Sequence, residues 1–138
     1  CILLAGRYTM LEHAALDELL PLCRQKNIGI MLGGPYNSGI LATGAVPGAT
    51  YNYKPASPAI MERVAKIEAI CKHHGEPIAA VALQFPLGHP NVSSMIPGAA
   101  KPEEVDRNIT LMQRKIPKAL WDELKYESLM PETAPVPE

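Results

Sequence analysis

Two segments of this chain combine residue types that suit the binding of a phosphorylated ligand. The first covers residues 33–41, where glycine, proline, asparagine and serine are gathered in one short stretch. Glycines let the backbone approach a ligand closely, and amides and hydroxyls can donate hydrogen bonds to phosphate oxygens. The segment matches neither the GxGxxG fingerprint nor the Walker A loop. A glycine-rich turn without a ligand is therefore an equal alternative.

The second segment covers residues 95–108, where the end of an expected strand is followed by an expected helix from about Pro102. A helix N-terminus attracts anions because its first amides lack partners and its dipole is positive there. We therefore expect an anion site here as well. Because every strand-to-helix connection has this shape, the feature alone does not identify a ligand.

The tyrosines of the expected loops are candidates for proton transfer, since a tyrosine beside a lysine can act as a proton donor. These residues are Tyr8, Tyr36, Tyr51 and Tyr53, with Lys54 next to Tyr53. No motif supports that role, and we favour rings that pack over the edge of a cofactor or substrate. Ser38 does not lie in a GxSxG motif, so we do not predict a nucleophilic serine.

His73 and His74 directly precede Gly75, which is expected to end a helix. The helix dipole favours a partly charged imidazole at that end. A zinc site would need at least a third ligand, and the surrounding sequence supplies none. We therefore predict a helix-terminal role for the two histidines and no metal site.

Short apolar runs and helical periodicity indicate the elements that position these segments. Strands are expected at residues 2–4, 28–32 and 92–96, and the uniformly apolar run 28–32 is expected to be covered on both faces. Between residues 33 and 57 we expect a long loop, and the Pro-rich residues 130–138 are expected to form a flexible tail. Helices are expected over residues 16–26, from the Ser57 N-cap to Gly75, over 77–85, from 102, and after Pro117.

Strands that alternate with helices in this order predict an α/β fold with a parallel sheet. Three strands are too few for a stable sheet of this kind, whereas a complete (β/α)8 TIM barrel takes ~250 residues. The chain also opens directly on an apolar run at Cys1. We therefore expect residues 1–129 to be the C-terminal half of a TIM barrel, and the chain to be a fragment.

Composition excludes several classes of partner. The net charge of −1 provides no field for holding nucleic acid or a charged membrane surface. No apolar run approaches the ~20 residues of a membrane span, and no signal peptide is visible. The three cysteines have neither metal-ligand spacing nor the even count of a disulfide framework. These features are typical of a cytoplasmic protein with reduced thiols.

The motifs Ala5-Gly6-Arg7-Tyr8-Thr9, Gly34-Pro35-Tyr36-Asn37-Ser38-Gly39-Ile40-Leu41 and Ile96-Pro97-Gly98-Ala99 together resemble the C-terminal half of the aldo-keto reductases. The resemblance covers essentially the whole chain. It is greatest to the branch of L-fucose, L-galactose and D-threo-aldose 1-dehydrogenases and pyridoxal dehydrogenases. It implies that the chain supplies strands six to eight of a (β/α)8 barrel, together with the following helices.

The same resemblance implies a nicotinamide dinucleotide bound by the loops after the last two strands. The diphosphate would lie against residues 34–41, and the adenosine end against residues 97–108, with Asn108 at the adenine. The implied cofactor-binding residues are Gly34, Pro35, Tyr36, Asn37, Ser38, Gly39, Leu41, Pro97, Gly98, Ala99, Lys101, Glu104 and Asn108.

Departures from the family pattern favour NAD over NADP. Glu104 stands where NADP-preferring members carry an arginine, and Gly98 replaces a lysine that is often present after the strand. A carboxylate repels a 2′-phosphate and can accept hydrogen bonds from a free ribose hydroxyl. Lys101 is the residue most able to reverse this preference. Many members have an aromatic side chain at the position of Gly33, where it stacks on the nicotinamide ring. This chain lacks that aromatic side chain.

The catalytic Asp, Tyr, Lys and His of the family lie in its N-terminal half and have no counterpart in this chain. We therefore predict no catalytic residue here. The first hypothesis is the cofactor-binding half of an NAD-dependent oxidoreductase of aldoses or other aldehydes and alcohols, inactive without the missing N-terminal half. The alternative hypothesis is a non-catalytic truncated barrel chain that acts through a protein partner or by self-association.

Overall fold

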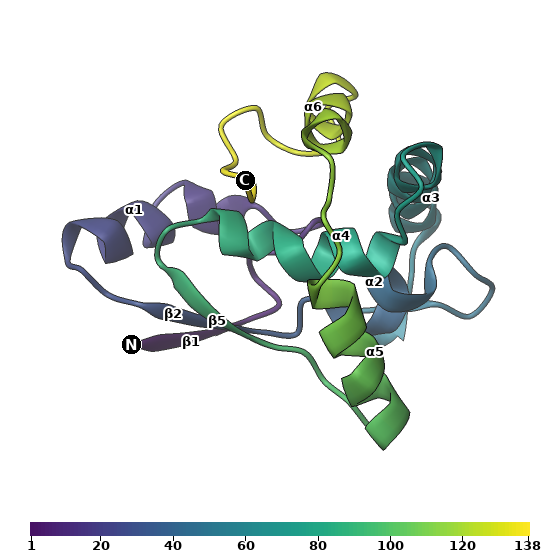
Figure 1. Cartoon of the computed structure of the whole chain (residues 1–138), viewed down its shortest axis with the longest axis horizontal. Coiled ribbons are helices and arrows are strands. Elements are labelled where there is room, and N and C mark those ends of the chain that lie inside the picture. Colours follow the sequence, from purple (N-terminus) through teal and green to yellow (C-terminus); the bar gives the residue numbers. More distant parts are fainter.

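Three short parallel strands form one layer of the computed structural model, which describes residues 1–138 (Figure 1). Their order in the sheet is β1 (Ile2–Ala5), β2 (Ile30–Gly33) and β5 (Val92–Ile96), and Ile2, Ile30 and Val92 share one row of the register. This result confirms the three expected strands and their parallel pairing. All three therefore end at the same edge of the sheet.

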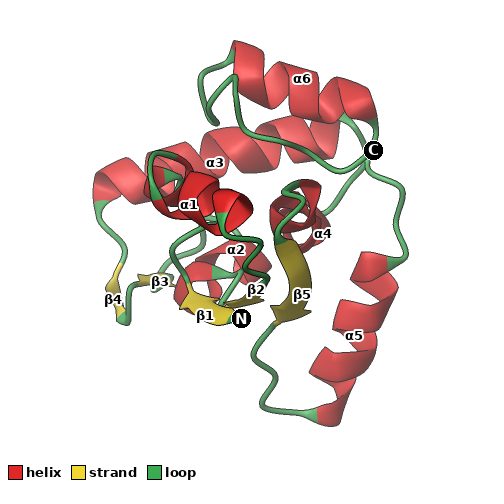
Figure 2. Ribbon diagram, turned by 90° about the vertical axis from the view of Figure 1, so that its left-hand side faces the viewer, coloured by secondary structure: helices red, strands yellow, loops and turns green.

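Helices α1, α3, α4 and α6 gather on one side of the strands, and α5 lies beside β5 (Figure 2). Ser57 caps α3 as expected, since its Oγ accepts a hydrogen bond from the amide of Ile60. The helix bounds are α1 (Leu19–Gln25), α2 (Ile40–Thr43), α3 (Pro58–His73), α4 (Ile78–Gln84), α5 (Pro102–Met112) and α6 (Lys118–Tyr126); short 3-10 turns cover Ala14–Leu16, Asn37–Gly39 and Phe85–Gly88.

Several boundaries differ from the expected ones, and β2 begins at Ile30 rather than at Ile28. The first helix begins at Leu19 rather than near Leu16, which places Pro21 in its first turn, where a missing N–H costs no hydrogen bond. The long loop after β2 is not irregular throughout, because it contains α2 and an antiparallel hairpin of β3 (Thr50–Tyr51) and β4 (Lys54–Pro55). Strands this short carry no periodic pattern that a sequence could reveal.

The sheet is covered on one face only, which corrects the expectation that β2 is covered on both. Ile30 and Leu32 are fully buried beneath the helices, whereas Met31 between them is exposed. Leu3 and Ile96, which point to the same open face, are 59% and 46% exposed. In a closed barrel this face is filled by side chains from all the strands, and three strands cannot supply them.

The core lies between the sheet and its helices and contains an aromatic cluster. The rings of Tyr8 and Phe85 have centroids 5.1 Å apart, and Trp121 of α6 lies 6.3 Å from Phe85. Tyr8 is fully buried, so it does not pack over a ligand as the sequence suggested. Burial raises the pKa of its hydroxyl above the ordinary value, so the hydroxyl stays protonated near neutral pH.

Residues 130–138, which were expected to form a flexible tail, contain no helix or strand, and part of this segment packs against the core. Met130 and Ala134 are buried in the core, and the Ala134 amide donates a hydrogen bond of 3.0 Å to the Pro131 carbonyl. The backbone of Val136 passes close to Gly88 at the end of a 3-10 turn. Apolar burial therefore holds a segment whose composition alone favours disorder.

Gly88→Ala is expected to lower the free energy of unfolding by about 1–3 kcal/mol. A methyl group there would lie 2.5 Å from the Val136 backbone, so the C-terminal segment must move away. Gly98→Ala is the matched control, because nothing lies within 4 Å of its added carbon. Urea unfolding curves measure both variants. Equal stability of the two variants would show that the segment does not pack against Gly88.

The cysteines agree with the sequence analysis in being free thiols. Cys23 and Cys71 are buried and Cys1 is exposed. Burial raises the pKa of Cys71 to about 12, so this thiol stays protonated and unreactive near neutral pH. In addition, no helix of the structure combines the length and the apolar character that crossing a bilayer requires.

Candidate functional site

A pocket of about 410 Å3 lies where the loops after β2 and β5 meet. Strands β2 and β5 are neighbours and run in parallel, so their following loops emerge side by side. In parallel α/β proteins this edge of the sheet carries the ligand site. The pocket is lined by Gly34, Pro35, Tyr36, Ser38, Gly39, Ala42, Thr43, Tyr53, Gly98, Glu104, Arg107 and Asn108.

The loop after β2 turns sharply because several consecutive residues adopt left-handed backbone conformations. The φ angles of Asn37, Ser38 and Gly39 are 46°, 63° and 105°. Asparagine and glycine tolerate this region, whereas β-branched residues do not. The Ser38 Oγ then accepts a hydrogen bond of 3.0 Å from the Tyr53 amide, which fastens the β3–β4 hairpin to the loop.

One face of α5 forms the opposite wall of the pocket. Glu104, Arg107 and Asn108 are spaced three and four residues apart, so they share that face. Tyr36 Oη donates a hydrogen bond of 2.7 Å to Asn108 Oδ1, and Arg107 Nη2 donates one of 3.1 Å to the Ala42 carbonyl. These two bonds join α5 to the loop after β2 across the pocket.

Tyr36 acts in this site as a neutral hydrogen-bond donor. Burial raises the pKa of Tyr36 to about 12, and the nearby Arg107 cation opposes this shift only in part. The hydroxyl is therefore protonated near neutral pH. Because Asn108 uses its oxygen toward Tyr36, its amide nitrogen is left to donate to a ligand.

Glu104 makes the N-terminus of α5 less suited to bind an anion than the sequence predicted. Its Oε2 accepts a hydrogen bond of 2.6 Å from the Ala100 amide, so a donor that the sequence offered to an anion is already used. Glu103 is a second carboxylate in the same turn. Both negative charges complement the helix dipole and disfavour an external anion at this end. The positive charge of the pocket comes instead from Arg107.

Eight of the residues expected to bind a cofactor line this pocket, and five do not. Asn37 and Leu41 are buried and do not line the pocket. Lys101 is exposed at the N-cap of α5 and does not line the pocket. Pro97 and Ala99 line a separate, more apolar groove of about 540 Å3 between β5 and α5. The eight are Gly34, Pro35, Tyr36, Ser38, Gly39, Gly98, Glu104 and Asn108.

The sequence analysis missed Ala42, Thr43 and Arg107 as lining residues, whereas Tyr53, one of the loop tyrosines expected near a ligand, does line the pocket. Arg107 could have been found, because it shares a helix face with Glu104 and Asn108. Tyr53 reaches the pocket through the β3–β4 hairpin, which no sequence pattern revealed. Tyr53 is almost fully exposed and makes no bond to Lys54, so the proton-donor alternative gains no support.

The loop after β1 lies near the same edge and is linked to the hairpin. Tyr51 Oη donates a hydrogen bond to the carboxylate of Glu12, and Arg7 lies 3.7 Å from that carboxylate. Burial raises the pKa of Tyr51, and the Glu12 bond adds to this effect. These contacts hold the hairpin and do not supply an acid–base pair. The pocket itself offers hydrogen-bonding groups and one cation, Arg107, to a ligand.

Comparison with known proteins gives consistent relatives for this chain. The sequence model of the aldo/keto reductase family matches residues 2–126. Pyridoxal 4-dehydrogenase of Microbacterium luteolum is 36% identical over 130 residues, which are 94% of this chain and 38% of that protein. D-threo-aldose 1-dehydrogenase of a Pseudomonas species is 37% identical over 131 residues, covering 94% and 40%. The chain thus spans about two fifths of the length of these curated relatives.

Solved structures show the same partial coverage. An aldo-keto reductase from Bacillus halodurans in its holo form superposes with a TM-score of 0.66 at 20% identity, over 99% of this chain and 44% of the other. The glycerol dehydrogenase of Gluconobacter oxydans gives a TM-score of 0.67 at 17% identity, over 94% and 44%. These neighbours confirm the expected fold class, the C-terminal part of a (β/α)8 TIM barrel.

Proposed function

Because the chain belongs to the aldo/keto reductase family, we propose that its pocket binds the dinucleotide of a nicotinamide-dependent oxidoreductase. The observation that supports this proposal most directly is the hydrogen bond between Tyr36 and Asn108. It joins the loop after β2 to α5 at the carboxyl edge of the sheet, where barrel enzymes bind their ligands. The partners of the protein would be this nucleotide and a small substrate.

The lining residues fit the parts of such a dinucleotide. Ser38 and the cationic Arg107 offer donors for a diphosphate, and the free amide of Asn108 offers donors for an adenine ring. Glu104 lines the same wall and can accept hydrogen bonds from a free ribose hydroxyl while repelling a 2′-phosphate. We therefore propose NAD rather than NADP as the cofactor. Lys101, the residue expected to be most able to reverse this preference, does not line the pocket.

When bound, the nicotinamide would exchange a hydride with an aldose or another aldehyde or alcohol. Two similar proteins are named for acting on D-threo-aldoses and on pyridoxal, which supports a small carbonyl or alcohol substrate. The charged residues of the pocket, Glu104 and Arg107, lie on one helix and serve binding. We propose that the acid and base come from an N-terminal half of the barrel, and that this chain alone binds nucleotide without turnover.

The exposed face of the sheet supports an N-terminal half as a partner. Leu3, Met31 and Ile96 are large apolar side chains left open to solvent on the face opposite the helices. Apolar side chains on a sheet face gain stability when a second layer covers them. The strands of the remaining barrel would provide that cover.

Tyr36→Phe is expected to weaken NAD binding by about 2- to 10-fold, because one neutral hydrogen bond contributes about 0.5–1.5 kcal/mol. The variant removes the donor to Asn108 and keeps the ring in place. Calorimetric titration of the purified protein with NAD and with NADP measures the effect. Tyr126→Phe is the control, since Tyr126 is exposed at the end of α6. An absence of saturable binding to either nucleotide would contradict the proposed function.

A further inference from the structure

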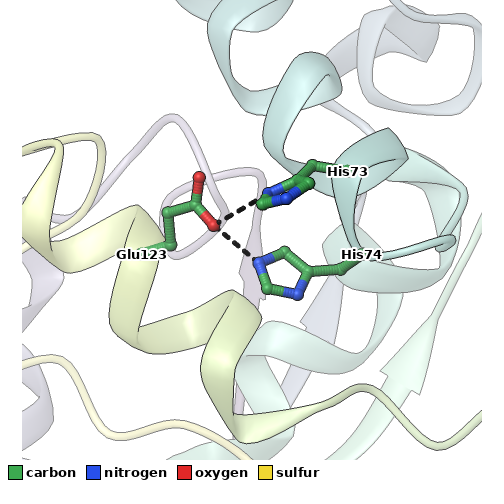
Figure 3. A group of neighbouring side chains, drawn as sticks. All are labelled: His73, His74 and Glu123. Atoms are coloured by element: carbon green, nitrogen blue, oxygen red, sulfur yellow. Dashed lines mark hydrogen bonds and ion pairs between the residues drawn. The ribbon is translucent and has the colours of Figure 1, made fainter.

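His73 and His74 converge on the carboxylate of Glu123, which lies on a different helix (Figure 3). Glu123 Oε2 is 2.6 Å from His74 Nε2 and 3.3 Å from His73 Nδ1. All three donor atoms lie within 4.8 Å of one another. None of these residues lines the nucleotide pocket, so the cluster is a separate feature of the molecule.

The end of α3 explains why two consecutive side chains point to one partner. His73 is the last residue of α3, and His74 is its C-cap. Gly75 then takes a φ of 74°, which reverses the chain. The two imidazole rings have centroids 5.0 Å apart, and α6 packs against α3 so that Glu123 faces them. The third ligand that the sequence lacked is therefore supplied 49 positions away from His74.

We propose that His73, His74 and Glu123 form a binding site for a divalent transition-metal ion of the Zn²⁺ class. Two imidazole nitrogens and one carboxylate oxygen are a ligand set that zinc uses, with a fourth position left to water. Metal–ligand bonds of about 2.0–2.1 Å in a tetrahedral site place the donor atoms about 3.3 Å apart. The pair of His73 and Glu123 already has this spacing.

Only small movements would complete the site. The distance between His74 and Glu123 must open from 2.6 Å, which rotation of the Glu123 side chain permits because it is one-third exposed. The His73 side chain is 72% exposed, so an ion can enter from solvent and keep a water ligand.

The local charges are compatible with a bound cation. Lys72, next to His73 in the sequence, is paired with Glu68 at 3.2 Å and does not compete for Glu123. An ion held by α3 and α6 would cross-link two helices whose residues are distant in the sequence. Because the ligands are brought together only in the folded chain, the ion would stabilise the native state. The expected effect of the ion is therefore a gain in stability of the folded chain.

The test uses the purified protein without a histidine tag. Titration with Co²⁺ is expected to give the visible absorption of a low-symmetry site at one equivalent, and Zn²⁺ is expected to displace the Co²⁺. Zn²⁺ is also expected to raise the melting temperature, and Mg²⁺ is not, because it prefers oxygen ligands. Glu123→Gln and His74→Ala are each expected to lower the Co²⁺ affinity by about tenfold or more.

Glu127→Gln is the matched control, because this carboxylate follows α6 directly and lies outside the cluster. It is expected to bind Co²⁺ as the natural protein does. His73→Ala, at the most exposed ligand, tests the site if a change at Glu123 or His74 disturbs folding. The proposal is overturned if the natural protein binds no Co²⁺ saturably, or if folded variants at the three positions bind it as tightly as the control.

Discussion

Glu104→Arg should raise the affinity for NADP relative to NAD by about 10- to 150-fold. A hydrogen-bonded charge pair contributes about 1.5–3 kcal/mol, and each 1.4 kcal/mol corresponds to a tenfold change. Glu104 lines the pocket on the same helix face as Arg107 and Asn108, so an arginine there would place a second cation at the wall. Calorimetric titration of both nucleotides gives the ratio of the two dissociation constants.

Two control variants test whether the change in nucleotide preference comes from the charge at position 104 itself. Glu104→Gln keeps an acceptor oxygen for the Ala100 amide but removes the negative charge, so it should shift the ratio less than arginine does. Glu103→Arg adds the same charge change in the same helical turn, outside the pocket lining. If Glu103→Arg shifted the preference as much as Glu104→Arg, the carboxylate of Glu104 would not be the residue that selects NAD.

Trp121→Ala should lower the free energy of unfolding by about 3–5 kcal/mol, the usual cost of removing a buried tryptophan. Trp121 is fully buried and lies beside Phe85, so it joins α6 to the aromatic core next to the sheet. Its loss would leave a large cavity between these elements. Urea unfolding is followed by circular dichroism, because Trp121 is the single tryptophan and its fluorescence disappears in the variant.

The matched control for this change is Tyr126→Ala, at the exposed end of the same helix. Exposed positions of this kind usually change stability by less than about 0.5 kcal/mol. The free energy of unfolding of Trp121→Phe should lie between those of Trp121→Ala and Tyr126→Ala, because phenylalanine keeps an aromatic ring in the cavity. A Trp121→Ala variant as stable as Tyr126→Ala would mean that α6 does not contribute to the core.

Local sequence patterns predicted the strands and the main helices and marked two segments as possible ligand sites, whereas the individual site residues came from the family resemblance. The Ser57 cap, the apolar stripe of α3 and Gly75 define one helix almost to the residue, since each signal acts over a single turn. The glycine-rich loop after β2 and the segment 95–108 were expected to bind a ligand, and residues of both line the pocket. These features depend on neighbours that are close in the chain.

Contacts between distant residues were decided by the tertiary structure alone. Tyr36 and Asn108 are 72 positions apart, and His74 and Glu123 are 49 positions apart, so no local pattern could pair them. Packing against Phe85 buries Tyr8, and the backbone of Val136 lies against Gly88. Propensity and periodicity act within a few residues, whereas the packing that unites distant side chains forms only when the whole chain has folded.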